Sequence, residues 1–143
     1  MPHVSQCTSS GLVEWLNTQP NGAAGTIYYS LEFTNLSGHA CTLRGYPGVS
    51  GITLGGAQLG SAASRSTGTP KKTITLAPGK TAASALGITE VGNFPASSCH
   101  PTTAAGLRVY APNQTAAKSI PFPFGACAKT GDLYLSVQAV RLS

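Results

Sequence analysis

Charged residues are scarce in this sequence, and acidic residues are the scarcest of them. Asp, Glu, Lys and Arg make up 9% of the 143 residues, whereas an average globular protein has roughly 25%. The low content of Glu and Lys argues against a helical protein, because exposed helix faces are usually rich in both. Ser, Thr, Gly, Ala and Pro fill the surface positions instead, which is common in secreted β-proteins.

The shortage of acids leaves few candidates for catalysis or metal binding. Calcium loops need several aspartates, and the chain has one, Asp132. A glycosidase needs two carboxylates on either side of a scissile bond, but we expect Glu14 and Glu32 to be surface residues of their strands. We therefore predict no metal site, no catalytic residues and no bound cofactor.

Histidine is rare as well, with His3, His39 and His100 the only three. A Ser-His-Asp triad needs a histidine base that a third group holds in place, and the sequence has no G-x-S-x-G element. We interpret the histidines as exposed loop or tail residues. The glycines of GYPGVSG (45–51) precede no helix pattern, so a phosphate-binding loop is not predicted there.

No long hydrophobic run is present, and none approaches the ~20 apolar residues of a membrane span. The start, MPHVSQC, lacks the basic and hydrophobic regions of a signal peptide. If the protein is exported, we expect this to be a mature form with an added Met1.

The net charge of +5 comes from nine scattered cations, with Lys71 and Lys72 the only adjacent pair. Nucleic-acid binding needs a concentrated basic stripe, so we do not expect it. A diffuse positive field favours weak attraction to an anionic wall or membrane surface.

The cysteines lack the close CxxC spacing of zinc or thioredoxin-type sites. They are Cys7, Cys41, Cys99 and Cys127. Dispersed cysteines in a chain poor in charge predict two disulfides and an oxidising compartment, although four reduced cysteines in a cytosolic protein are an alternative. Spacing leaves all three connectivities open. We favour sequential pairing, Cys7–Cys41 and Cys99–Cys127, because it closes two moderate loops.

Period-two patterns predict strands along most of the chain. Apolar residues alternate with polar ones in GTIYYSLEFTN (25–35), KTITL (72–76), TAASALGIT (81–89), GLRVYA (106–111) and DLYLSVQAVRLS (132–143). Turn residues separate these runs, which predicts about seven to nine short antiparallel strands in a sandwich or barrel. We expect one domain over 7–143, a disordered tail over 1–6, a mobile inter-strand loop over 55–72 and at most a short helical turn in VGNFPASSC (91–99).

Several tyrosines are candidates for contact with a partner. Tyr28, Tyr110 and Tyr134 fall on the outward phase of their strands, and exposed tyrosines on adjacent strands can form a binding face. We expect Tyr46 to fold its ring onto the edge of the core, and the tip formed by Tyr46 and Pro47 is a further candidate contact.

The run NLSGHACTLRGYPGVSGITLGGAQLG (35–60) carries the most specific pattern in the chain. With the Leu-Ala-Pro-Gly-Lys-Thr-Ala turn and the two later cysteines around a Leu-Arg-Val strand, it resembles a family of secreted and lipoprotein domains of unknown function that is common in actinobacteria. The resemblance covers essentially the whole chain from Cys7. It implies an exported immunoglobulin-like β-sandwich with sequential disulfides, and it supplies no catalytic residues.

We therefore predict a non-enzymatic domain that is secreted or extracytoplasmic and binds a protein or a cell-wall component, as a monomer or weak oligomer. Whether the precursor is a lipoprotein or freely secreted stays open. One alternative is an inhibitor that presents a rigid loop, from 55–72 or GYPGVSG, to a secreted hydrolase. A hydrolase is the other alternative, and it requires His39 or His100 hydrogen-bonded to a serine in a cleft.

Overall fold

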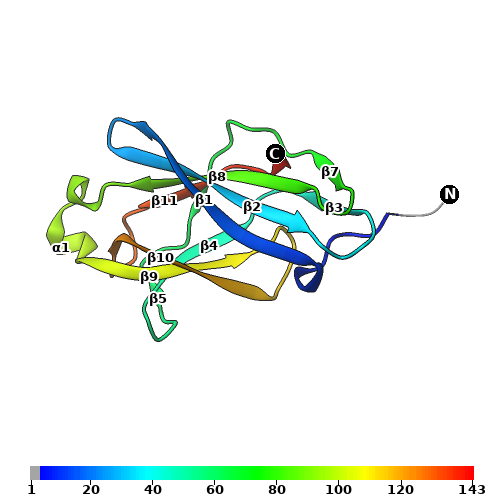
Figure 1. Cartoon of the computed structure of the whole chain (residues 1–143). Coiled ribbons are helices and arrows are strands. Elements are labelled where there is room, and N and C mark those ends of the chain that lie inside the picture. Colours follow the sequence, from blue (N-terminus) through cyan, green and yellow to red (C-terminus); the bar gives the residue numbers. More distant parts are fainter. Residues whose placement is uncertain (1–3) are drawn as a thin grey trace.

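The computed structural model describes residues 4–143, and this part of the chain is mostly β (Figure 1). It contains twelve strands in a six-stranded, a four-stranded and a two-stranded sheet. The six-stranded sheet contains β1 (Leu12–Ala23), β2 (Thr26–Asn35), β8 (Thr81–Thr89), β11 (Leu135–Val137), β6 (Ser64–Arg65) and β12 (Arg141–Leu142). The four-stranded sheet contains β10 (Ala117–Cys127), β9 (Pro101–Tyr110), β4 (Gly48–Ile52) and β5 (Gln58–Leu59).

The two-stranded sheet pairs β3 (Cys41–Arg44) with β7 (Thr73–Leu76). Among residues 4–143, helical structure is confined to short pieces. Two of them, η2 (Val91–Asn93) and α1 (Ala96–Cys99), lie in 91–99, where a short helical turn was expected, whereas η1 (Ser9–Gly11) was not expected. The described residues form more strands than the expected seven to nine. The additional strands are β5, β6 and β12, each only two residues long. Pairs this short give no recognisable alternation in a sequence.

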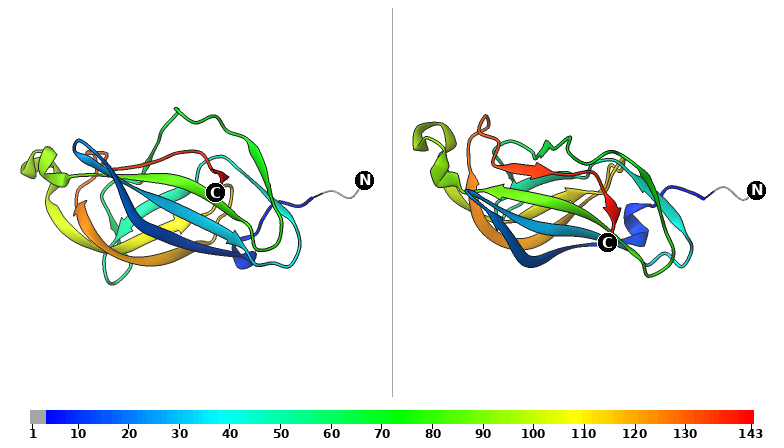
Figure 2. Two further views of the ribbon diagram at one scale, coloured as in Figure 1. Left: turned by 45° about the horizontal axis from the view of Figure 1, so that its top comes forward. Right: turned by 90° about the horizontal axis from the view of Figure 1, so that it is seen from above.

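The two larger sheets lie as layers with the hydrophobic core between them (Figures 1 and 2). Leu31 and Phe33 of β2 contribute to this core from one layer, and Leu107 and Val109 of β9 contribute from the other. The period-two patterns of β2 and β9 predicted these inward residues. Six of the nine residues of β8 are buried and the other three are half-buried. β8 is an inner strand of its sheet, because β2 pairs along one side of it while β11 and β12 pair along the other.

The segment 55–72, expected as a mobile loop, crosses between the two layers. Its strand β5 pairs with β4 in one sheet, and its strand β6 pairs with β11 in the other. The β6–β11 pair is parallel, so the expectation of a wholly antiparallel arrangement is wrong at this point. A short strand in such a segment is not one arm of a hairpin, so its direction is not fixed by a neighbouring strand in the sequence. It can therefore pair in parallel with the exposed edge of a sheet.

The alternating run at 132–143 predicted one strand, but it forms two short ones, β11 and β12. The alternation fails at its start, where Leu133 is 54% exposed and Tyr134 is fully buried. Both residues precede β11, so the alternation of a strand does not apply to them. The later inward residues Leu135, Val137 and Ala139 are buried as predicted.

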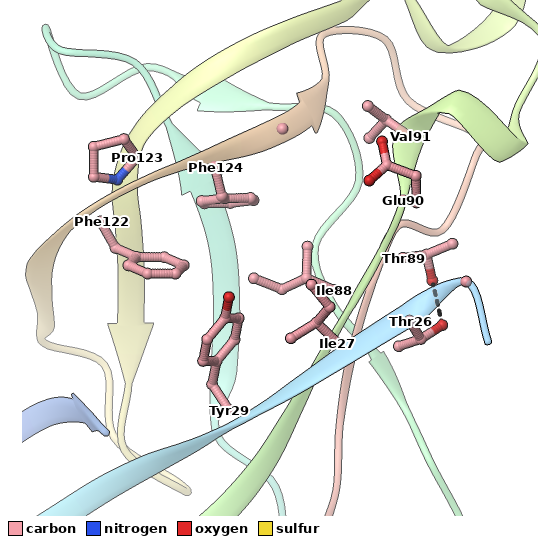
Figure 3. A pocket seen from close by; sticks show the side chains of 12 residues that line it. Thr26, Ile27, Tyr29, Ile88, Thr89, Glu90, Val91, Phe122, Pro123 and Phe124 are labelled. Atoms are coloured by element: carbon pink, nitrogen blue, oxygen red, sulfur yellow. Dashed lines mark hydrogen bonds between the residues drawn. The ribbon is translucent and has the colours of Figure 1, made fainter. Parts of the chain in front are cut away.

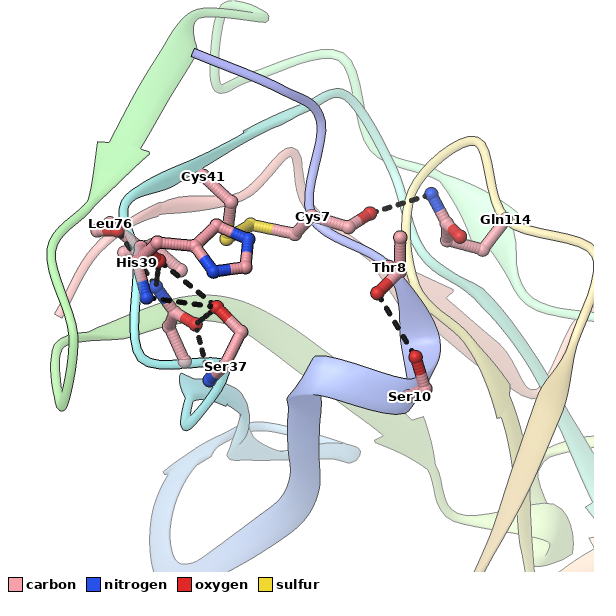
Figure 4. The surroundings of a disulfide bond; sticks show 9 residues. Cys7, Thr8, Ser10, Ser37, His39, Cys41, Leu76 and Gln114 are labelled. Atoms are coloured by element: carbon pink, nitrogen blue, oxygen red, sulfur yellow. Dashed lines mark hydrogen bonds between the residues drawn. A yellow bond between two sulfur atoms is a disulfide. The ribbon is translucent and has the colours of Figure 1, made fainter.

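Two disulfides are present, Cys7–Cys41 and Cys99–Cys127, with the expected sequential connectivity. The first bond ties the N-terminal segment to β3 (Figure 4). Of the tail expected over 1–6, residues 1–3 lie outside the described residues. Ser5 and Gln6 pair with Thr42, whose amide donates to the Ser5 carbonyl at 2.9 Å.

Asn35, at the end of β2, is a fully buried polar residue that joins three segments close to the first disulfide. Its Nδ2 donates to the carbonyls of His39 and Leu76, both at 2.9 Å, and its Oδ1 accepts from the amide and the hydroxyl of Ser37 (Figure 4). A buried amide side chain must have its hydrogen bonds satisfied, and this one is satisfied by the turn and by β7.

No helix among the described residues is both long and apolar enough to span a membrane.

Candidate functional site

The Gly-Tyr-Pro-Gly loop carries the chain from β3 in the two-stranded sheet to β4 in the four-stranded sheet. Gly45 begins the turn with φ +100°, a conformation that favours glycine. The ring of Tyr46 packs against the core, as predicted, and its hydroxyl donates to the Ser66 carbonyl at 2.9 Å. This bond fixes the loop to segment 55–72.

An open pocket of ≈440 Å³ lies beside this loop, and we call it the basic pocket. It is lined by Arg44, Gly45, Tyr46, Gly48, Arg65, Lys71, Tyr110, Ala111, Asn113 and Gln114. Three separate chain segments deliver its cations: the end of β3, strand β6 and the stretch before β7. Arg65 lies over the Tyr46 ring, with 5.4 Å from Cζ to the ring centre, which is cation–π distance.

The opposite wall of the basic pocket is held by side chain to backbone hydrogen bonds. Asn113 adopts φ +62°, and its Nδ2 donates to the Arg44 carbonyl at 3.1 Å. Gln114 donates from Nε2 to the Cys7 carbonyl at 2.8 Å. Tyr110 packs over Gly48, where an added Cβ would lie 3.4 Å from the ring. The wall is therefore preformed rather than dependent on a ligand.

The chemistry of the basic pocket is that of an anion site. Its lining includes Arg44, Arg65 and Lys71 but no carboxylate. Guanidinium groups donate several hydrogen bonds in a fixed planar fork that matches carboxylate and phosphate oxygens. Three cations around one pocket give it a positive potential that attracts an anion.

The structure separates the tyrosines that were predicted to form a partner-binding face. Tyr46 and Tyr110 meet in the basic pocket, whereas Tyr28 lies on β2 in the other large sheet. The half-buried ring of Tyr28 covers Gly87. Pro47 is buried and does not form an exposed tip. The prediction failed because a strand's outward phase does not say which sheet the strand joins.

Tyr134, also predicted to be outward, is 0% exposed. Its hydroxyl donates to the Leu59 carbonyl at 2.6 Å, beneath β5 and directly over Gly51. Burial raises the pKa of Tyr134 to about 12, partly offset by a backbone hydrogen bond from Gly51. Tyr134 therefore holds β5 to the core and is not available to a partner.

A second open pocket, of ≈500 Å³, lies toward the other end of β9, and we call it the aromatic pocket (Figure 3). It is lined by Gly25, Thr26, Ile27, Tyr29, Ile88, Thr89, Glu90, Val91, Phe122, Pro123, Phe124 and Gly125. A bulge in β10 shapes one wall, because Pro121 pairs with Gly106 while Phe124 pairs with Ala104. Gly106 allows the close approach, since a Cβ there would lie 2.3 Å from the Ile120 carbonyl oxygen.

Glu14 is a buried acid, although a surface position was predicted for it. It is 8% exposed, and neither carboxylate oxygen has a hydrogen-bond partner among the residues of known placement. Burial raises its pKa to about 7, and the nearby Lys118 ammonium opposes that rise. Period two could have identified it, because Glu14 is in phase with Leu12 and Leu16 on β1. Glu32 is also buried, and it accepts from the Ser143 hydroxyl at 3.1 Å.

The groups needed for a catalytic triad are not brought together within residues 4–143. Ser98 donates directly to the Asp132 carboxylate at 2.7 Å, with no histidine between them. His39 contacts Ser37 through its backbone amide and carbonyl rather than its imidazole. His3 lies outside the described residues. The one metal-type cluster in the same range is Cys99, Cys127 and Asp132, and its two cysteines are joined as a disulfide.

Comparison with known proteins gives one family. No curated protein and no solved structure matches the chain. A family profile described as "Domain of unknown function (DUF4232)" matches residues 7–141. This range runs from the first cysteine to the start of β12 and includes both pockets. The chain therefore belongs to the DUF4232 domain family.

Proposed function

We propose that this protein is a non-enzymatic, exported binding module that holds an anionic component of the cell envelope in the basic pocket. The observation that carries this proposal is the convergence of Arg44, Arg65 and Lys71, from three separate segments, on one acid-free pocket. The sequence has nine Lys and Arg in all, so a third of them meet at this site.

Two features support a place outside the cytoplasm and a binding role. The two disulfides are typical of oxidising compartments. The scaffold suits a rigid, immunoglobulin-like display of loops, in keeping with the actinobacterial secreted domains that the sequence resembles. Acidic wall polymers carry phosphate or carboxylate groups, and both fit an arginine fork.

The test uses soluble polyanions and two variants of equal net charge. The first variant removes the pocket cations as Arg44→Gln, Arg65→Gln and Lys71→Gln. The matched control removes three cations that do not line the basic pocket, as Lys72→Gln, Lys80→Gln and Lys129→Gln. Binding of the oxidised protein to polyphosphate, polygalacturonate and neutral dextran is measured at physiological salt, where the diffuse field is largely screened.

We expect the wild type and the control variant to bind at least one polyanion and the pocket variant to bind neither. Dextran should not bind in any case. Equal loss of binding in the two variants would mean that net charge alone is responsible and would contradict the proposal. Absence of binding by the wild type to both polyanions would contradict it as well.

A second candidate function, inhibition of a secreted protease, is favoured by the β4–β5 hairpin. Leu54 at its tip is 95% exposed. The tip is braced by hydrogen bonds between Thr53 and Ala57, at 2.8 and 3.0 Å, and by the Arg108 guanidinium, which donates to the Gly56 carbonyl. A rigid loop with an apolar residue at its apex can occupy a protease subsite at low entropic cost.

An inhibitor of this kind would slow subtilisin or chymotrypsin at equimolar ratio while remaining uncleaved. Leu54→Gly should abolish the effect, and Leu133→Gly, which removes an exposed leucine elsewhere, should not. Rapid cleavage after Leu54, or unchanged protease activity, would exclude this candidate.

A further inference from the structure

The aromatic pocket has the size and composition of a small-molecule site. Its volume of ≈500 Å³ lies within the roughly 300–1,000 Å³ of typical ligand pockets. Ile27, on β2, is 43% exposed and lines it together with Ile88 and Val91. Contact between an apolar side chain and water is unfavourable. A ligand that covers the side chain in the pocket removes this contact, which favours binding.

Three aromatic rings form one side of the aromatic pocket. Tyr29 meets Phe122 edge to face at 5.1 Å between ring centres, and Phe122 stacks on Phe124 at 5.8 Å. Figure 3 shows both phenylalanine side chains leaving β10 toward Tyr29, whose hydroxyl points into the pocket. The face of an aromatic ring carries partial negative charge and attracts cations.

The charged side chain that lines the aromatic pocket is negative, and the faces of aromatic rings are partly negative as well. Glu90 lines it and no Lys or Arg does, although cations outnumber acids nine to four in the sequence. The backbone of Glu90 is fixed, because its amide donates to the Gly25 carbonyl and its carbonyl accepts from the Asn93 amide, both at 2.9 Å. Figure 3 places its side chain across the pocket from Phe122.

We propose that the aromatic pocket binds a small organic ammonium ion. The cationic head lies between the Glu90 carboxylate and the rings of Phe122 and Phe124, and an aryl or branched alkyl body covers Ile27 and Ile88. A neutral apolar molecule would gain the apolar contacts but not the electrostatic ones. An organic anion would be repelled by Glu90. This site is separate from the basic pocket, so its test does not depend on the proposed function.

The test compares three probes that share a phenyl ring and differ in charge: benzyltrimethylammonium, benzyl alcohol and benzoate. Amide and methyl NMR shifts of the oxidised wild-type protein are followed during each titration. We expect benzyltrimethylammonium to saturate shifts at Ile27, Ile88 and Glu90, with affinity about tenfold above that of benzyl alcohol, as a cation–π contact and a carboxylate together allow. Benzoate should bind more weakly than either.

Two variants separate charge at the site from charge elsewhere. Glu90→Gln should lower the affinity for benzyltrimethylammonium about fivefold or more while leaving benzyl alcohol unchanged. The matched control, Asp132→Asn, removes the same charge outside the pocket and should change neither affinity. If Phe122→Leu folds, it should lower the affinity for benzyltrimethylammonium more than the affinity for benzyl alcohol. If it does not fold, the result for Glu90→Gln decides the question.

Three results would each overturn the proposal. The first is equal affinity for benzyl alcohol and benzyltrimethylammonium, which would indicate an apolar pocket without charge selection. The second is an equal effect of Glu90→Gln and Asp132→Asn. The third is the absence of saturable shifts at the pocket residues.

Discussion

At the residue scale, a carboxyl group enclosed between two sheets responds to pH in the opposite direction from a paired surface carboxyl. The pKa of Glu14 rises from 4.5 to about 7 in the folded protein. Between these values the folded state holds a proton that the unfolded state has released, so stability falls as pH rises. The loss amounts to roughly 3 kcal/mol and is complete above the folded pKa.

Glu14→Gln stays neutral at every pH and should lack this dependence. We expect the variant to match the wild type below pH 4.5 and to be more stable than it above pH 7, the limits set by the two pKa values. Urea unfolding at a series of pH values measures the difference. Glu90→Gln, which changes an exposed acid, serves as the control and should show no such divergence. Parallel pH profiles for wild type and Glu14→Gln would contradict the assignment.

Asn35 supports the fold through hydrogen bonds rather than through apolar contact. Asn35→Ala leaves the carbonyls of His39 and Leu76 without their donor, and we expect a loss of about 2–4 kcal/mol. Asn35→Asp keeps the acceptor for Ser37 but loses the same donor, so it should also destabilise. Asn21→Ala, at an exposed position of β1, should stay within about 0.5 kcal/mol. Equal losses in the free energy of unfolding for Asn21→Ala and Asn35→Ala, measured with denaturant, would contradict this role of Asn35.

At the element scale, alternation predicted strand interiors well and strand ends poorly. Ile74 and Leu76 are buried while Thr73 and Thr75 are exposed, as the KTITL pattern indicated. Tyr134 shows the limit, because it lies one residue before β11 and is buried by β5 from a distant part of the chain. Local periodicity holds no information about which distant strand will cover a loop residue.

The candidate sites were hidden from the sequence for a related reason. Arg44, Arg65 and Lys71 fall in three unrelated contexts along the chain, and only the turn at Gly45 and the crossing segment bring them together. The pattern around Tyr46 did predict its ring on the core, because the glycine and proline beside it turn the chain at the end of a buried strand. Glu14 differs from its predicted surface position because it is in phase with Leu12 on β1, although acidic residues are rarely buried.

Two glycines of segment 55–72 differ in how closely they are packed, and their variants test how tightly β5 lies against the second disulfide. Gly60 has φ +64°, and an added Cβ would lie 2.5 Å from the Cys127 carbonyl oxygen. Gly56 has φ +91° with nothing within 4 Å. Gly56→Ala should therefore cost only the backbone strain, about 1 kcal/mol.

Gly60→Ala adds a clash with backbone to the same strain, so we expect at least about 2 kcal/mol of destabilisation. Thermal or urea unfolding of the two variants gives the comparison. Equal effects would mean that β5 moves freely away from Cys127.

At the scale of the whole molecule, the two disulfides constrain different regions. They close loops with sequence separations of 34 and 28, and by chain entropy each contributes about 3–4 kcal/mol. Together this is comparable with the roughly 5–15 kcal/mol total stability of a typical domain.

We expect Cys7→Ala/Cys41→Ala and Cys99→Ala/Cys127→Ala to lose similar amounts and the reduced protein to be marginally folded. Urea unfolding of the oxidised chain and of each double variant measures the loss. If the urea midpoint of either double variant equals that of the wild type, the disulfide removed in that variant does not stabilise the fold, which would contradict the prediction.

The N-terminal segment runs beside the basic pocket, where Gln6 donates to the Asn113 carbonyl at 3.4 Å and Gln114 donates to the Cys7 carbonyl at 2.8 Å. The aromatic pocket is lined by residues at the ends of β8 and β10, and these strand ends lie at the opposite end of the molecule from this segment (Figure 1). A sensor chip or bead coupled through the N-terminal side would thus shield the basic pocket and leave the aromatic pocket facing the solution. The direction in which the protein is mounted decides which of the two proposed ligand classes it can report.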